Sequence, residues 1–224
     1  MINALQGVRI LNMQKPPAAQ KPVSLRKKPV QSRSQFTLGA LQGAFVRVLI
    51  ERGFEKITIR EVVSVAGIGV GTFYDYVPNL RALAASTIHK RCTDTAEHLR
   101  ASIAPFAGES FAVLTRALLQ ALVREGFGKP KEWTALLLLE RQVSSAAALR
   151  KIHESYVGIW ASALSQSSDK PPEDKLQSVA RMAHALSYGW YSHDLLFYAD
   201  DPKHQRSLEE MIKAIAGLLP SSLG

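Results

Sequence analysis

Two short apolar runs separated by a glycine constrain this chain more than any other feature of its sequence. The first run spans Ile59–Val65 and the second spans Val70–Tyr76, with Gly67 between them. Thr58 can cap the first run, because its hydroxyl can accept the amide of Glu61 while the Glu61 side chain reaches back, as in a capping box. Gly67 permits the left-handed backbone of a tight turn. The segment therefore predicts two short helices joined by a sharp turn.

Helical periodicity continues on both sides of this segment, and no alternating strand pattern of useful length occurs. Glycine and proline separate the periodic stretches. We therefore predict an all-α chain with an N-terminal head of three to four helices and a larger helical body. Helices are expected over residues 36–50, 59–65, 70–76, 79–104, 109–126, 131–142, 145–168, 173–199 and 204–219.

Positive charge is concentrated at the N-terminal end. The 224 residues carry a formal net charge of +9. Residues 1–91 hold 14 basic and 4 acidic residues, a net charge of +10, whereas the remainder holds 14 basic and 15 acidic residues, a net charge of −1. Residues 1–33 are rich in proline and glutamine and predict a flexible basic arm. This distribution indicates a polyanionic partner for the N-terminal part alone.

The run from Ala66 to Tyr76 closely resembles the helix-turn-helix signature of the TetR family of bacterial repressors. Residues 51–58 are similar to the end of the first helix and the start of the second in that family, and the resemblance covers about residues 36–84. It implies nine or so helices, a homodimer and a ligand-binding C-terminal body. The expected domains are the arm at 1–33, a helix-turn-helix DNA-binding domain at 34–84, and a ligand-binding and dimerisation domain at 85–224.

Four positions depart from the family pattern. Gly69 stands where serine is usual at the cap of the recognition helix, and Val63 and Val77 replace an alanine and a phenylalanine. Leu80 replaces the lysine that usually opens the fourth helix, which removes a typical phosphate contact. Arg81 is the candidate replacement for that contact.

The resemblance and the side-chain chemistry together assign DNA contacts to both short helices. Arg60 is expected to reach a base edge, because a guanidinium group pairs bidentately with guanine. Hydroxyl groups such as that of Thr72 suit phosphate oxygens, which fix register without reading sequence. The candidate DNA-binding residues are Thr58, Arg60, Val70, Gly71, Thr72, Tyr74, Asp75, Tyr76 and Arg81.

Other roles stay open for three of these residues. Tyr74 could pack within the head, and Asp75 could remain solvated because its charge repels phosphate. Arg60 could pair with Glu55 or Glu61 on the surface.

Apolar and amphipathic residues in the middle helices of the body predict a ligand cavity. Apolar walls with a few polar groups are typical of such cavities, and the alternative is a closed core. The predicted ligand is a small, mostly apolar effector, and the helix at 79–104 is the expected lever between body and head. The candidate ligand-binding residues are Phe111, Leu114, Leu118, Trp133, Leu137, Tyr156, Trp160, His184 and Tyr188.

The last two predicted helices are apolar over much of their surface and contain many small residues. A pair of such helices from each of two subunits would form a four-helix bundle across a two-fold axis. We therefore predict a homodimer through residues 173–219, with packing inside one chain as the alternative. A charge at Ala183 or Ile212 is expected to produce monomers.

Several other classes of protein are disfavoured. Cys92 is the only cysteine, so no intramolecular disulfide forms, which agrees with a cytoplasmic protein. No apolar run approaches the ~20 residues of a membrane span, and no signal-peptide pattern opens the chain. The glycines at 67, 69 and 71 follow a helical pattern rather than a strand, which argues against a nucleotide-binding loop. No catalytic residue, cofactor or metal is expected, although His89 and Cys92 share one helix face.

The sequence thus predicts a sequence-specific DNA-binding transcriptional regulator. In the leading interpretation it is a repressor that a small apolar effector releases from a palindromic operator. The alternative is a DNA-binding protein without an effector, either constitutive or an activator. An enzyme, such as a helical transferase with an accessory DNA-binding head, is a distant third.

Overall fold

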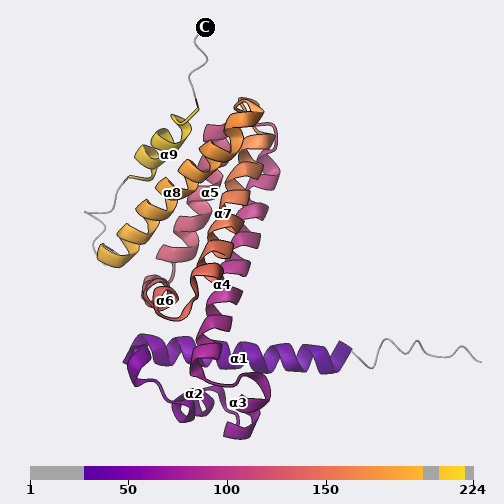
Figure 1. The fold of residues 1–224 in the computed structure, drawn as a ribbon, viewed down its shortest axis with the longest axis vertical. Coiled ribbons are helices and arrows are strands. Elements are labelled where there is room, and N and C mark those ends of the chain that lie inside the picture. Colours follow the sequence, from indigo (N-terminus) through magenta and orange to yellow (C-terminus); the bar gives the residue numbers. More distant parts are fainter. Residues whose placement is uncertain (1–27, 199–206, 220–224) are drawn as a thin grey trace, which may run out of the picture. The chain divides into compact units, whose positions relative to one another are not determined.

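The computed structural model describes residues 28–198 and 207–219, and all regular structure within them is helical (Figure 1). The predicted all-α architecture is therefore confirmed. The α-helices are α1 (Lys28–Arg52), α2 (Ile59–Ala66), α3 (Val70–Tyr76), α4 (Leu80–Ile103), α5 (Phe111–Phe127), α6 (Pro130–Val143), α7 (Ala146–Gln166), α8 (Glu173–Phe197) and α9 (Leu208–Ala216). Two short 3₁₀ turns, η2 (Phe54–Lys56) and η3 (Ala104–Phe106), follow α1 and α4.

Helix α1 begins at Lys28, earlier than the predicted start near residue 36 and inside the predicted arm at 1–33. Pro29 is compatible with this start, because the first turn of a helix has amides without intrahelical partners and tolerates proline. The rest of the predicted arm lies outside the described residues, as do the end of the predicted helix 173–199 and the start of the predicted helix 204–219. The chain divides into two compact units, residues 1–37 and 38–224.

Within the unit 38–224, the head is built around buried side chains of α1, α2, α3 and the start of α4. Phe45 and Phe73 are fully buried, and Phe45 meets Phe54 edge-on at a ring separation of 6.3 Å. Helix α6 contributes to the same core through Leu136, Leu139 and Val143. The head core is thus completed by a helix that lies far from it in the sequence.

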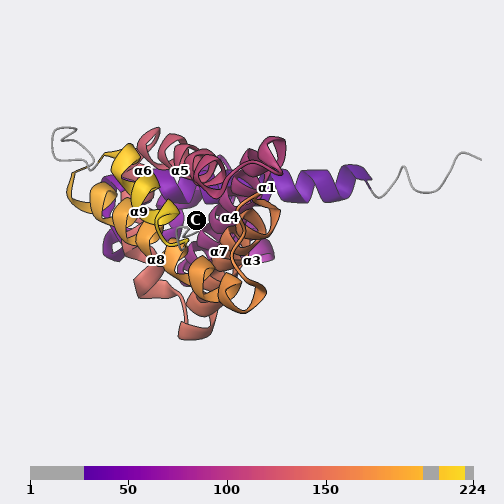
Figure 2. The same ribbon diagram turned by 90° about the horizontal axis from the view of Figure 1, so that it is seen from above.

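The body is a second core formed by α4, α5, α6, α7, α8 and α9. Helices α7 and α8 lie side by side in both views (Figures 1 and 2), and an ion pair joins Arg181 to Glu154 across them at 2.9 Å. Asp169, in the connection between these two helices, accepts the Phe111 amide at 2.7 Å. Because this amide opens α5, the hydrogen bond satisfies one of its free donors. Helices α4 and α6 belong to both cores, so they link the head to the body.

Candidate DNA-binding head and ligand cavity

The first short helix of the head begins with the predicted capping box. The Thr58 hydroxyl accepts the Glu61 amide at 3.2 Å, and the Glu61 carboxylate accepts the Thr58 amide at 3.0 Å and the Thr58 hydroxyl at 2.9 Å. These hydrogen bonds, with Arg52 nearby, lower the pKa of Glu61. Thr58 is therefore engaged in defining the start of α2, and its candidate DNA contact stays a prediction.

The turn between α2 and α3 depends on Gly67, whose φ of 70° and ψ of 31° place it in the left-handed region. The next amide, of Ile68, donates to the carbonyl of Val63 at 3.0 Å and closes the turn. Phe73 of α3 is fully buried beneath it. Because a residue with a Cβ is strained at such a φ, the glycine determines how the two helices meet.

The predicted DNA-contacting residues of α2 and α3 differ in exposure, whereas Phe73 between them is fully buried. Tyr74 is 55% exposed and packs edge-on against the Phe73 ring at 5.4 Å. Thr72 and Tyr76 are half-buried at the margin of the head core. Four further members of the set are exposed: Arg60, Val70, Gly71 and Asp75.

The two arginines proposed for DNA contact differ in their surroundings. Within the described part of the chain, Arg60 forms neither a hydrogen bond nor an ion pair, because Glu61 is held by Thr58 and Arg52. Arg81 instead donates to the carbonyl of Gln142 at 2.8 Å, near the C-terminus of α6. A phosphate contact by Arg81 would require this guanidinium to leave α6.

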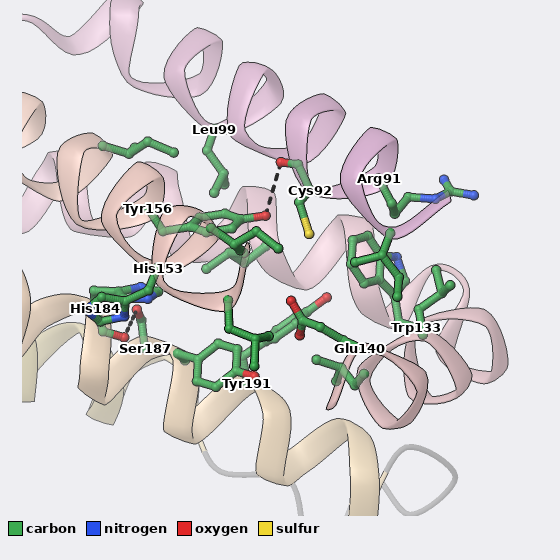
Figure 3. Close-up of a pocket in the computed structure, with 18 of the residues that line it drawn as sticks. Arg91, Cys92, Leu99, Trp133, Glu140, His153, Tyr156, His184, Ser187 and Tyr191 are labelled. Atoms are coloured by element: carbon green, nitrogen blue, oxygen red, sulfur yellow. Dashed lines mark hydrogen bonds between the residues drawn. The ribbon is translucent and has the colours of Figure 1, made fainter. Parts of the chain in front are cut away.

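The body contains a partly open cavity of about 290 Å³ between α4, α5, α6, α7 and α8 (Figure 3). Seven of the nine candidate ligand-binding residues line it: Leu118, Trp133, Leu137, Tyr156, Trp160, His184 and Tyr188. Phe111 and Leu114 do not line it, because both are fully buried in the body core. Whether a ligand binds there stays a prediction.

One wall of the cavity is a row of polar aromatic rings. Tyr156 donates to the carbonyl of Cys92 at 3.3 Å, and its ring stacks on His184 at 5.7 Å with planes 4° apart. Burial and the neighbouring His153 lower the pKa of His184 to about 4, so this imidazole is neutral at neutral pH. Burial also raises the pKa of the Cys92 thiol to about 12. The row therefore offers hydrogen-bonding groups without a charge.

The predicted set of ligand-binding residues omitted several residues that line this space, including Cys92, Glu140, His153 and Tyr191. Glu140 carried a signal that could have identified it. It follows Trp133 and Leu137 at spacings of seven and three residues, which places it on the apolar face of α6. A carboxylate on the buried stripe of a helix is uncommon, because burying a charge without a partner is costly.

The exposed face of α8 corrects the choice of residues for the predicted dimer interface. Ala183 is fully buried and Ile212 of α9 is nearly so, both inside their own chain. A charge at either position would disrupt the protomer, so the expectation that such variants report on dimerisation is wrong. The exposed stripe of α8 instead consists of Ser178, Met182, Ala185, Gly189 and Phe197.

Two further structural observations concern the described residues only. No described helix combines the length and apolar character needed to cross a bilayer. In the same residues, histidine, cysteine and carboxylate side chains do not gather in groups of three or more that could hold a metal ion.

Comparison with known proteins matches residues 43–87 to the family described as bacterial regulatory proteins, tetR family. A helix-turn-helix-type transcriptional regulator of Bacillus subtilis (strain 168), YxbF, is 31% identical over 100 residues. That match covers 42% of this chain and 26% of the relative, so the chain spans about a quarter of the relative's length.

Similar solved structures cover most of the chain. A TetR family transcription regulator from Marinobacter aquaeolei VT8 superimposes with a TM-score of 0.60 at 15% identity, over 84% of this chain and 96% of the other. The multidrug binding protein EbrR, solved in complex with imidazole, gives a TM-score of 0.61 at 18% identity, over 82% and 95% of the two chains. At these identities the similarity shows a shared fold.

Proposed function

We propose that this chain, whose residues 43–87 match the TetR family of bacterial regulatory proteins, is a DNA-binding transcription regulator of that family. In this proposal it is a dimeric repressor that a small, mostly apolar effector releases from a palindromic operator. The observation that carries the proposal is the double role of α6. This helix lines the cavity through Trp133, Leu137 and Glu140, and it completes the head core through Leu139 and Val143.

A shared helix gives the effector a physical route to the DNA-binding head. A ligand changes operator affinity only if it binds the two conformations of the protein with different affinities. A molecule that displaces the cavity face of α6 also displaces side chains packed in the head. Helix α4 offers a second route. Its residue Ile88 packs in the head core and also lines the cavity, and Leu99, further along the same helix, lines the cavity as well. A coupling of about 1–3 kcal/mol is typical and changes affinity roughly 5- to 150-fold.

The DNA-binding role is assigned to the exposed side of α2 and α3. In a helix-turn-helix the first turn of the second helix enters the major groove, and in α3 this turn presents Val70 and Gly71. Arg60 on α2 supplies the guanidinium for a base edge. Thr72 and Tyr76 supply hydroxyl groups for phosphate oxygens.

The dimer is assigned to α8 and α9, as the sequence predicted. The exposed stripe on α8 combines small side chains, such as Ala185 and Gly189, with the apolar Met182, which is 52% exposed. Small residues let helices approach closely, and a two-fold interface pairs the same patch of both subunits. Two heads related by this axis would read two half-sites of a palindrome.

The effector is assigned to the cavity on the strength of its lining. Indole and phenol rings surround the space, which suits a compact, mostly apolar compound. The multidrug binding character of EbrR, a protein of the same fold, is consistent with such a ligand.

The proposal is tested in two steps with the full chain. Site selection from random DNA is expected to yield an inverted repeat. Operator release is then measured by fluorescence anisotropy across a panel of small apolar compounds, alongside tryptophan fluorescence as a report of binding. Recovery of an inverted repeat with no compound that binds or releases DNA would leave the alternative, a DNA-binding protein without an effector.

A further inference from the structure

Glu140 is a buried carboxyl group on the cavity wall. It is 9% exposed and points from α6 into the space between Tyr156 and Tyr191 (Figure 3). In the part of the chain that the structure describes, its carboxylate forms no hydrogen bond and no ion pair. Burying a carboxylate without a hydrogen bond or ion pair costs free energy. Its position on the wall of the cavity therefore indicates a role in binding a ligand.

The positive charges along the same cavity are already engaged. Arg91 forms an ion pair with Glu132. Arg141 is exposed to solvent and donates to the Tyr188 hydroxyl at 3.3 Å. The buried charge on the cavity wall is therefore that of Glu140, whereas the positive charge of Arg141 lies where the wall is exposed to solvent.

Burial raises the pKa of Glu140, and the nearby Arg141 acts in the opposite direction. The carboxylate is thus disfavoured on this wall by loss of hydration. A cation placed beside it would supply the missing attraction, and the same low polarity that penalises the lone charge strengthens that attraction. An anion placed there would be repelled by the carboxylate.

The remaining walls also suit a cation with apolar substituents. The faces and edges of Trp133, Tyr156, Trp160, Tyr188 and Tyr191 border the space, and aromatic faces attract cations within about 6 Å. The volume of about 290 Å³ lies at the lower end of the ~300–1,000 Å³ typical of ligand pockets. A molecule with one ring and a compact cationic group fits these limits.

We infer that the effector cavity takes a small aromatic organic cation and that the Glu140 carboxylate is the counter-charge that recognises it. The inference rests on the proposed effector function for its biological meaning. The binding event itself is tested without DNA, so that its failure is separable from failure of the repressor proposal.

The test uses the full chain and three probes that differ in charge. Benzyltrimethylammonium is the cation, neopentylbenzene is its neutral counterpart with carbon in place of nitrogen, and 3-phenylpropionate is an anion. Affinity is measured by tryptophan fluorescence, because Trp133 and Trp160 line the cavity. The cation is expected to bind about tenfold or more tightly than the neutral probe, and the anion is expected to bind least.

Two variants identify the group responsible. Glu140→Gln keeps the side-chain shape and is expected to remove the preference for the cation while keeping the affinity for the neutral probe, which also shows that the cavity is intact. Glu154→Gln removes an exposed carboxylate that is paired with Arg181 on the outside of α7 and is expected to leave all three affinities unchanged. The inference would be overturned if the wild type did not bind the cation, bound the cation and the neutral probe equally, or bound the anion more tightly. A preference for the cation that survives in Glu140→Gln would also overturn it.

Loss of operator binding is measured separately with the same cation. Binding of the cation in the predicted manner without operator release would uphold the role of Glu140 and contradict the effector function. Operator release by compounds whose affinity does not depend on Glu140 would uphold the effector function and contradict the role of Glu140.

Discussion

Arg60 and Gly71 are two exposed residues of the head whose proposed role is contact with DNA. The Arg60 guanidinium is exposed, and its acidic neighbour Glu61 is held in the capping box by Thr58. Gly71 lies in the first turn of α3, where a Cβ would meet nothing within 4 Å among the described residues. Neither residue has a role in the packing of its own chain, so both are expected to matter when DNA is bound.

Replacing Arg60 by alanine is expected to weaken the selected operator by about 1–3 kcal/mol more than non-specific DNA, because the bidentate hydrogen bonds to a base are removed. The measurement is fluorescence anisotropy with both kinds of DNA. Arg47→Ala, which removes another exposed arginine, from α1, is the matched control and should lower both affinities alike. An equal loss for Arg60→Ala would remove its base-reading role.

Gly71→Ala is expected to stabilise the free protein and to weaken operator binding. Alanine is favoured over glycine within a helix by roughly 0.5–1 kcal/mol, which raises Tm by about 2–4 °C per kcal/mol in a chain of this size. The added methyl group would occupy the space through which the backbone approaches a base edge. A stabilised variant with unchanged operator affinity would place Gly71 away from the DNA.

At the scale of elements, the sequence predicted the positions of the helices more accurately than the directions in which their side chains point. The predicted helix 59–65 ends one residue before α2, and the predicted helix 131–142 is one residue shorter than α6 at each end, because caps and prolines mark their limits. Apolar side chains of α5 look alike in sequence, however, and only the packing of five helices separates the core residue Leu114 from the cavity residue Leu118.

The same limit explains the error at the predicted dimer interface. Ala183 and Ala185 are two residues apart on one helix and equally small, yet the first is fully buried and the second is exposed. Helices have 3.6 residues per turn, so such positions point in very different directions. The amphipathic pattern of α8 is weakened by small residues on both faces, which leaves the direction undetermined by sequence alone.

Ala185→Glu is expected to convert the proposed dimer to monomers. The two-fold axis would place the two introduced carboxylates close together, where they repel each other and lose hydration against the apolar stripe of the partner subunit. The folded protomer should keep its helical content by circular dichroism. Ala101→Glu, the same change at an exposed position of α4, is the control and should leave the mass unchanged in analytical ultracentrifugation. A dimer that persists in Ala185→Glu would exclude the α8 stripe as the interface.

At the scale of the whole molecule, charge and coupling are separate properties of the chain. The net charge of +10 over residues 1–91 supports long-range attraction to DNA without sequence information. The proposed coupling would depend on the two helices, α4 and α6, that belong to both cores. The two properties are therefore expected to respond to different changes.

Removing residues 2–27 takes away five basic residues and no acidic ones. If the arm neutralises DNA phosphates, the slope of log K against log salt concentration should become shallower by about 0.9 for each phosphate that is no longer neutralised. The thermal stability of the remaining chain should be unchanged. A slope equal to that of the full chain would show that the arm does not bind DNA phosphates.

The central claim is that occupancy of the cavity and operator affinity are coupled, and reciprocal binding measures this most directly. The compound that best releases the operator is titrated into the free protein and into the protein saturated with operator, with tryptophan fluorescence as the signal. Because coupling is reciprocal, we predict that the operator weakens binding of the compound by the same factor, about 5- to 150-fold, by which the compound weakens binding of the operator. Equal affinity of the compound for the free and the operator-bound protein would contradict the account.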